Sequence, residues 1–132
     1  QLIMSDKFTV EIISPDQTIL KLETNEVIIP SYEGEMGILK NHIPLITFLR
    51  PGIIIIKNHE EKKYFVEDGT VEFSENNLLI LTSTAKNLAT FSKESISKLL
   101  KEVEIKLNDS SSTDKEKYLL SYKRNILKEI NQ

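Results

Sequence analysis

Hydrophobic and polar residues alternate in short runs along the first two-thirds of the chain, which is the pattern of strands that bury one face. The first run covers residues 8–13 and ends at Ser14, Pro15 and Asp16, residue types that favour a turn. Similar runs, separated by turn residues, follow at residues 18–23, 26–29, 53–57, 63–67, 71–74 and 78–82. Strands this short and closely spaced, with no helical period between them, predict an antiparallel sandwich or barrel.

The pattern changes near Ser92, after which apolar residues recur at steps of three and four. Ser92 is expected to cap a first helix, whose apolar face comprises Ile96, Leu99, Leu100, Val103 and Leu107. After a polar break, Thr113 and Glu116 have the spacing of a capping box. They begin a second helix, whose expected apolar seam is Leu119, Tyr122, Ile126 and Ile130. We therefore predict a β + α fold: an N-terminal antiparallel β-sandwich domain (1–90) followed by a C-terminal antiparallel two-helix hairpin (91–132).

Charge is divided unevenly between these two parts. The chain of 132 residues has 17 Lys or Arg and 20 Asp or Glu, which gives a net charge of −3. Residues 1–91 account for −5 of this charge and residues 92–132 for +2. A basic helical tail on an acidic sandwich suggests that the tail meets an acidic partner, although a solvated helix face explains the same charges equally well.

Composition argues against several classes of function. The acidic balance disfavours nucleic-acid binding, which needs a basic surface. Cysteine is absent, so disulfides and thiolate chemistry are excluded. No apolar run approaches the roughly 20 residues that span a bilayer, so we expect no direct membrane insertion. His42 and His59 accompany no known catalytic motif, and the four glycines form no phosphate loop, so we expect no catalysis, cofactor or metal.

The densest group of unusual residues lies at positions 30–45. Gly34 and Gly37 are three residues apart and permit a positive φ or a close backbone approach, so we expect a structured loop of fixed shape. His42 follows in the same segment. On residue types alone, a corner of the sandwich with His42 hydrogen-bonded in place explains the group better than a binding site does.

Three short motifs follow one another in the middle of the chain: Gly34-Glu35-Met36-Gly37-Ile38, His42-Ile43-Pro44-Leu45 and Arg50-Pro51-Gly52. Their order and spacing are similar to the epsilon subunits of F-type ATP synthases, which have Gly-Glu-hydrophobic-Gly-Ile, His-x-Pro-Leu and x-Pro-Gly. The resemblance extends to the first strand and turn (10–15), an aromatic hairpin (65–69) and the last strand (78–85). Each motif is short, but together they make the resemblance specific over residues 8–85.

The resemblance implies a non-catalytic rotor subunit of the central stalk, which couples catalysis to ion translocation. In the family, the sandwich docks on the gamma subunit and its lower loops rest on the c-ring of the membrane sector. The implied contact residues for gamma or the c-ring are Ser14, Glu35, Met36, Gly37 and His42. The implied location is peripheral, on the cytoplasmic face of a bacterial inner membrane or the stromal face of a thylakoid.

The resemblance also implies that the terminal helices regulate ATP hydrolysis. They can fold on the sandwich or extend along gamma to the catalytic alpha and beta subunits and block hydrolysis. The cations that we assign to this regulatory helix are Lys117, Lys123, Arg124 and Lys128. Lys117, Arg124 and Lys128 recur at steps of seven and four, so they share one face away from the apolar seam. We expect this face to be free to meet an acidic surface on beta.

Some bacterial members of the family bind ATP through an apolar-Asp-x-x-Arg-Ala motif at the start of the first helix. In this chain the aligned stretch begins at Phe91, and Ser92, Ser95 and Ile96 replace the acid, the arginine and the alanine. The replacement removes the planar guanidinium that grips phosphate. We therefore expect ATP binding to be weak or absent.

Two other classes of function remain open. A β-sandwich binding module for sugar or peptide, with an unrelated helical tail, would expose an aromatic platform. This chain has no tryptophan, and its aromatic residues are mostly spaced as core. A small hydrolase would need His42 or His59 beside an acid and a nucleophile in a pocket. Co-purification with gamma separates a rotor subunit from both alternatives.

Overall fold

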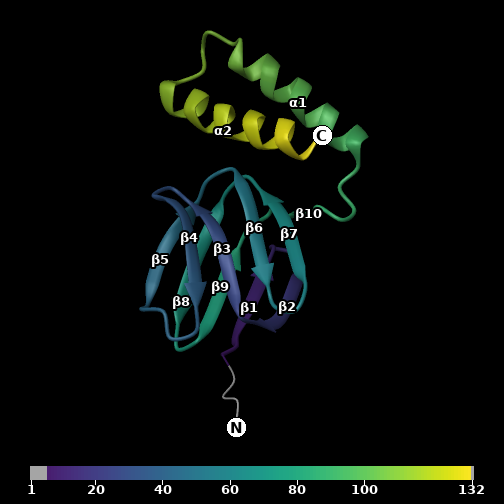
Figure 1. The fold of residues 1–132 in the computed structure, drawn as a ribbon. Helices are drawn as coiled ribbons and strands as arrows, with labels where there is room; N and C mark the ends of the chain where they lie inside the picture. Colours follow the sequence, from purple (N-terminus) through teal and green to yellow (C-terminus); the bar gives the residue numbers. More distant parts are fainter. Residues whose placement is uncertain (1–5, 132) are drawn as a thin grey trace.

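The chain folds into the two parts that the sequence predicts, a β-sandwich followed by two helices (Figure 1). The computed structural model describes residues 6–131, so residues 1–5 of the expected sandwich domain and Gln132 lie outside the described residues. The strands are β1 (Phe8–Ile13), β2 (Thr18–Thr24), β3 (Glu26–Ser31), β4 (Gly34–Leu39), β5 (Leu45–Leu49), β6 (Gly52–Lys57), β7 (Glu61–Val66), β8 (Gly69–Ser74), β9 (Asn77–Leu81) and β10 (Lys86–Asn87). The helices are α1 (Lys93–Leu107) and α2 (Asp114–Ile130).

All the strands of the described part belong to one sheet, which curls so that its two faces form a sandwich (Figure 1). The strand order is β10-β7-β6-β3-β5-β8-β9-β1-β2, and β4 pairs with β3 beside this path. The pairs are antiparallel, as predicted, except that β1 runs parallel to β9 with Val10 opposite Leu78. This parallel pair places the first strand beside the last long one, and it joins the two ends of the sandwich domain.

The predicted loop over residues 30–45 is wrong over much of its length. β4 covers Gly34–Leu39 and β5 begins at Leu45, so only short turns at 32–33 and 40–44 remain. The turn between β3 and β4 is closed by the Ser31 hydroxyl, which donates to the Gly34 carbonyl at 2.7 Å. Two glycines interrupt the alternation of side chains in β4, and this obscured the strand in the sequence.

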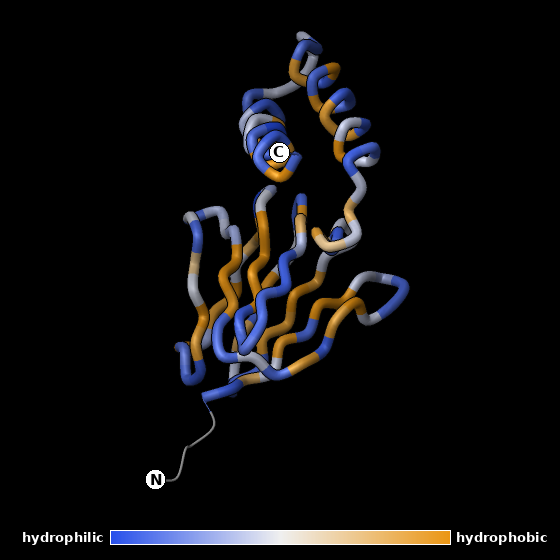
Figure 2. Tube along the Cα trace, turned by 45° about the vertical axis from the view of Figure 1, so that its right-hand side comes forward, coloured by the Kyte–Doolittle hydropathy of each residue, from blue (hydrophilic) through white to orange (hydrophobic). Residues whose placement is uncertain are grey.

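The main core lies between the two layers of the sandwich and is built from the inward-facing residues of the strands. It includes Val10 and Ile12 from β1, Ile54 and Ile56 from β6, and Phe73 from β8, all nearly inaccessible to solvent. Hydrophobic segments accordingly run through the body of the sandwich in Figure 2, whereas the two helices alternate hydrophobic and hydrophilic residues turn by turn. Most of the predicted alternation is thus confirmed.

Both helices begin at the predicted residues. Ser92 caps α1 and accepts from the Ser95 backbone N–H at 3.1 Å. Thr113 and Glu116 form the predicted capping box, with Thr113 N donating to Glu116 Oε1 at 2.7 Å and Glu116 N donating to Thr113 Oγ1 at 3.1 Å. These bonds satisfy backbone donors that a helix start leaves without partners.

The predicted apolar seam of α2 needs correction. Leu127 is its one fully buried side chain in the described part, and Leu120 packs with it, although neither residue was in the predicted seam. Ile126 and Ile130 do pack in this cluster. The reason is that α2 contacts both α1 and the sandwich, so it carries two overlapping apolar stripes.

The two helices form an antiparallel hairpin that lies across one end of the sandwich, opposite the end at which β1 begins (Figure 1). We call this the hairpin end and the opposite end the far end. A second core joins the hairpin to the sheet; Phe65 of β7 is its fully buried residue from the sheet, and Ile53 of β6 packs against it. Phe65 points away from the main core, into which its neighbours Tyr64 and Val66 point, yet it is 0% exposed because the hairpin covers it.

Candidate functional site

One outer face of the sandwich is apolar and exposed. Residues paired across adjacent strands share a face, and the strand registers place two rows on the outside of β5, β8, β9 and β1. The rows are Phe48–Thr70–Leu81–Ile13 and Ile46–Glu72–Leu79–Glu11. We call this surface the outer face. Ile46 is 75% exposed, Phe48 59% and Leu81 44%, so these large apolar side chains form an exposed apolar patch.

A hollow lies at each end of the outer face. The far-end hollow has a volume of about 430 Å³ and is lined by Pro44, Ile46 and Phe73, among others. The hollow at the hairpin end, about 600 Å³, is lined by Leu81, Thr82 and Ser14. Ser14, one of the predicted contact residues, therefore adjoins the outer face. A surface that is apolar in the middle and hollowed at both ends can accept projecting side chains of a protein partner.

Glu35, Met36 and Gly37 lie on β4 and do not share one orientation. Glu35 is exposed and lines a groove of about 260 Å³ beneath α2, together with Arg50 and Tyr122. Met36 points inward and packs against the main core, so packing accounts for its side chain. Gly37 is exposed, has no positive φ, and a Cβ there would meet only Glu26 Oε2, at 3.5 Å. Gly34, in contrast, has a φ of 122°.

His42 lies at the far end, away from Glu35, because β4 runs from the hairpin end to the far end (Figure 1). Its ring packs edge-on against Phe73, with centroids 5.9 Å apart, and its Nδ1 lies 2.7 Å from the Ile43 carbonyl oxygen. The preceding residue, Asn41, binds Asn76 of the β8–β9 turn in both directions. His42 is therefore a hydrogen-bonded corner residue, as its residue type predicted, and it packs on Phe73, one of the residues that line the far-end hollow.

The hairpin interface uses several of the predicted regulatory cations. Lys123 Nζ lies 2.8 Å from Glu67 Oε1, which joins α2 to the sandwich. Arg124 pairs with Glu104 of α1 at 3.6 Å. The expectation that Arg124 belongs to a free basic face is therefore wrong in this conformation, since its charge already faces a carboxylate within the hairpin. Lys128 is exposed and Lys117 half-buried.

Arg50 and Tyr122 form a second contact between the sandwich and α2. The Arg50 guanidinium lies 4.2 Å from the Tyr122 ring centroid and donates to the Tyr122 hydroxyl at 3.1 Å. Contact with Tyr118 raises the pKa of Tyr122, and the nearby Arg50 charge opposes part of that rise. The hydroxyl is therefore neutral at physiological pH and remains an acceptor for Arg50.

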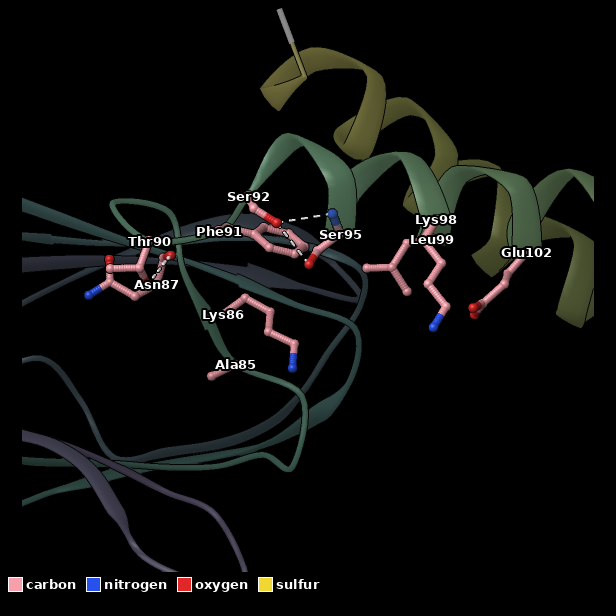
Figure 3. Close-up of a pocket in the computed structure, with 10 residues that line it drawn as sticks. All are labelled: Ala85, Lys86, Asn87, Thr90, Phe91, Ser92, Ser95, Lys98, Leu99 and Glu102. Carbon is pink, nitrogen blue, oxygen red and sulfur yellow. Dashed lines mark hydrogen bonds between the residues drawn. The ribbon is translucent and has the colours of Figure 1, made fainter.

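The start of α1 borders a groove of about 530 Å³ (Figure 3). Lys86 of β10 forms one wall, and Lys98 and Glu102 of α1 border the same opening. Ser92 and Ser95 bind each other: Ser92 Oγ donates to Ser95 Oγ at 2.9 Å. The Ser92 hydroxyl thus caps the helix, and the Ser95 hydroxyl accepts its hydrogen bond.

The described residues offer neither a metal-ligand group nor a membrane-spanning helix. No group of His, Cys, Asp or Glu side chains among residues 6–131 is arranged to hold a metal ion. Neither helix in that range is long and apolar enough to cross a bilayer.

Sequence reasoning missed Ile46 and Phe48, the most exposed large apolar residues of the outer face. The signal was present: residues 45–49 read Leu-Ile-Thr-Phe-Leu, and this run does not alternate. A strand that is apolar on both faces is typically covered on both faces. The run therefore indicated a strand with a core on one side and a partner on the other.

Comparisons with known proteins agree with this architecture. Residues 7–88 match the family model described as ATP synthase, Delta/Epsilon chain, beta-sandwich domain. The ATP synthase epsilon chain of Pelagibacter ubique is 47% identical over 130 residues, covering 97% of this chain and 100% of that protein. The mitochondrial ATP synthase subunit delta of Schizosaccharomyces pombe is 36% identical over 110 residues, 80% of this chain and 66% of that protein. A chain in the Euglena gracilis mitochondrial ATP synthase structure (OSCP/F1/c-ring) has the same fold, with a TM-score of 0.73 at 22% identity, covering 96% of this chain and 80% of that one.

Proposed function

The chain belongs to the delta/epsilon family of ATP synthase subunits, and from this premise we propose that it is a non-catalytic epsilon subunit of the central stalk. In this role it couples catalysis to ion translocation through a gamma subunit and a c-ring. The observation that carries the proposal is the outer face, where Ile46, Phe48 and Leu81 are exposed together.

The outer face is the proposed docking surface for gamma. Protein interfaces have an apolar centre with a polar rim, and a few large side chains contribute most of the binding free energy. Phe48 and Ile46 supply such a centre, and Glu72 and Glu11 lie in the same row as Ile46. Ser14 lines the hollow at the hairpin end, and His42 packs on Phe73, one of the residues that line the far-end hollow. We therefore assign Ser14 and His42 to the gamma contact.

Glu35 and Gly37 are proposed to contact the c-ring. Both are exposed on β4, which pairs only with β3 and is not among the strands of the outer face. An exposed carboxylate and a residue without a side chain suit contact with polar loops, because the backbone can approach closely at the glycine. This assignment implies a peripheral location on the cytoplasmic face of a bacterial inner membrane, or its stromal equivalent.

The hairpin is proposed to restrain ATP hydrolysis by leaving the sandwich and reaching the catalytic alpha and beta subunits. The second core, which joins hairpin and sheet, contributes few side chains from the sheet, with Phe65 and Ile53 among them. Such a small interface is compatible with two alternative positions of the hairpin. The structure describes the docked position.

The gamma contact is tested by measuring the affinity of purified gamma for variants of the full chain. Ile46→Ser and Phe48→Ser should each weaken binding about tenfold or more, as expected for truncation of a central apolar side chain. The matched control is Ile105→Ser on α1, since Ile105 is 71% exposed, close to the 75% of Ile46, but lies outside the outer face. Equal affinities for the Ile46 and Ile105 variants would contradict the proposed docking surface.

A further inference from the structure

Two consecutive residues of α2 each bind a charged residue of the sandwich. Tyr122 receives the Arg50 hydrogen bond and cation–π contact, and Lys123 pairs with Glu67 at 2.8 Å. The Lys123 side chain is 12% exposed and the Glu67 side chain 30%, so this ion pair is largely shielded from water. Shielding makes the attraction stronger than that of a surface pair, which is worth about 0–1 kcal/mol.

The two contacts restrain the helix in a way that apolar packing does not. Neighbouring residues on a helix point about 100° apart, so Tyr122 and Lys123 are held from different directions. The apolar contacts around Phe65 and Leu127 tolerate sliding and rotation, because hydrophobic attraction is not directional. The polar contacts fix the register of α2 on the sandwich.

Both sandwich partners are themselves held in place. The Arg50 backbone N–H donates to the Pro30 carbonyl at 3.0 Å, and the Glu67 backbone N–H donates to Thr84 Oγ1 at 3.0 Å. These bonds use the backbone and leave the Arg50 and Glu67 side chains available to α2. The backbones of both residues are therefore anchored by bonds within the sandwich that do not involve the hairpin.

From this arrangement we infer that Arg50 and Glu67 form a latch that holds the hairpin docked on the sandwich. Releasing the hairpin breaks the Glu67–Lys123 pair and returns the Lys123 ammonium to solvent or to another carboxylate. On the proposed function, that carboxylate belongs to an acidic surface of the catalytic head. Glu67 then competes with this surface for the same cation, so docking and inhibition exclude each other at Lys123.

The latch is tested on the free full-length chain by single-molecule energy transfer between labels on the far end and on the hairpin loop. The chain has no cysteine, so His59→Cys and Ser110→Cys provide two exposed labelling sites. Glu67→Gln keeps the size of the side chain and removes its charge. It should raise the ratio of released to docked molecules about tenfold, which corresponds to 1.36 kcal/mol. Lys123→Gln should have a similar effect.

The matched control is Glu61→Gln on β7, because Glu61 pairs with Lys63 on the sheet and not with the hairpin. The reversed pair Glu67→Lys with Lys123→Glu should restore docking, and high salt should reduce the difference between wild type and Glu67→Gln. Far-ultraviolet circular dichroism checks that each variant keeps its sheet. Equal released fractions for Glu67→Gln, Lys123→Gln and Glu61→Gln would overturn the latch. Because the assay contains no catalytic head, its result does not depend on whether the hairpin inhibits ATP hydrolysis.

Discussion

The rings of Phe65 and Phe91 stack nearly parallel, with centroids 5.9 Å apart and 22° between their planes. Phe65 belongs to β7, whereas Phe91 lies in the link to α1. The domain boundary predicted after residue 90 therefore passes through a packed aromatic pair. Phe65 belongs to the sheet, but its side chain packs in the second core with the hairpin and not in the main core of the sandwich.

We predict that residues 1–90 fold as a sandwich with a new apolar patch at the surface that the hairpin covers in the full chain. The main core contains no residue beyond 90, so the sheet should form, but Phe65 and Ile53 lose their cover. Losing the burial of one phenylalanine costs about 1.5–3 kcal/mol. Circular dichroism should show an intact sheet, and chemical denaturation should show reduced stability.

Phe65→Thr in this fragment is the informative control. It should improve solubility in the fragment and destabilise the full chain, where Phe65 is buried. Absence of sheet in the fragment would mean that the hairpin is needed for folding.

The fold was largely predictable because its regular parts obey simple periodicities. Strands with one buried face, such as β1, alternate visibly, and the capping residues Ser92 and Thr113 have local chemistry that marks a helix start. β4 and β5 escaped detection for opposite reasons: glycines weaken the alternation in β4, and β5 is apolar on both faces.

The contact residues were less predictable than the fold, because sequence motifs do not say where the ends of a strand point. Glu35 and His42 belong to neighbouring motifs, yet β4 carries them to different ends of the sandwich. The pairing of Arg124 with Glu104 also depends on how α2 packs on α1. Long-range packing decides such relationships, and local patterns carry no information about them.

The glycines differ in what they tolerate. Gly69 has a φ of 145°, and a Cβ there would lie 2.5 Å from the Leu81 carbonyl oxygen. Gly69→Ala should destabilise the chain by about 1–3 kcal/mol, whereas Gly37→Ala should change stability little. Denaturation midpoints of the two variants measure this contrast. A Gly69→Ala variant as stable as Gly37→Ala would contradict the described backbone.

Gly37→Val separates coupling from folding. The φ of Gly37 is not positive, and a Cβ there would meet only Glu26 Oε2 at 3.5 Å, so the variant should fold. If Gly37 contacts the c-ring, the added side chain should reduce proton pumping per ATP hydrolysed in reconstituted vesicles. An unchanged ratio of protons pumped to ATP hydrolysed would mean that Gly37 does not contact the c-ring.

ATP binding to the free chain should be weak or absent. Ser92 and Ser95 bind each other at the start of α1 and provide no guanidinium for a phosphate. Calorimetric titration with ATP should give no saturable heat at micromolar concentrations. Ser95→Arg tests whether the missing guanidinium is the cause, since it places that group at this position. Micromolar affinity in the wild-type chain would show that other residues of the groove suffice.

The last prediction concerns the cations of α2 that remain available in the docked state. Lys117, Arg124 and Lys128 share one side of the helix, but Arg124 faces Glu104. Replacing Arg124 with glutamate would place two carboxylates together and disturb the hairpin itself. The better variant combines Lys117→Glu and Lys128→Glu with Arg124→Gln, which removes the basic face without that repulsion.

If the hairpin restrains hydrolysis by meeting an acidic surface, this triple variant should raise steady-state ATP hydrolysis by the reconstituted head severalfold. Partly desolvated charge pairs are worth on the order of 1 kcal/mol or more each, so losing two or three of them shifts the hairpin away from the head. High salt should produce part of the same increase with the wild-type chain, because it screens the attraction. Lys115→Glu is the matched control, since Lys115 lies on the opposite side of α2 from these cations. The fragment of residues 1–90, which lacks the hairpin, gives the rate of hydrolysis without inhibition by the hairpin. Coincident rates at low salt for wild type, the triple variant and residues 1–90 would mean that this hairpin does not restrain hydrolysis.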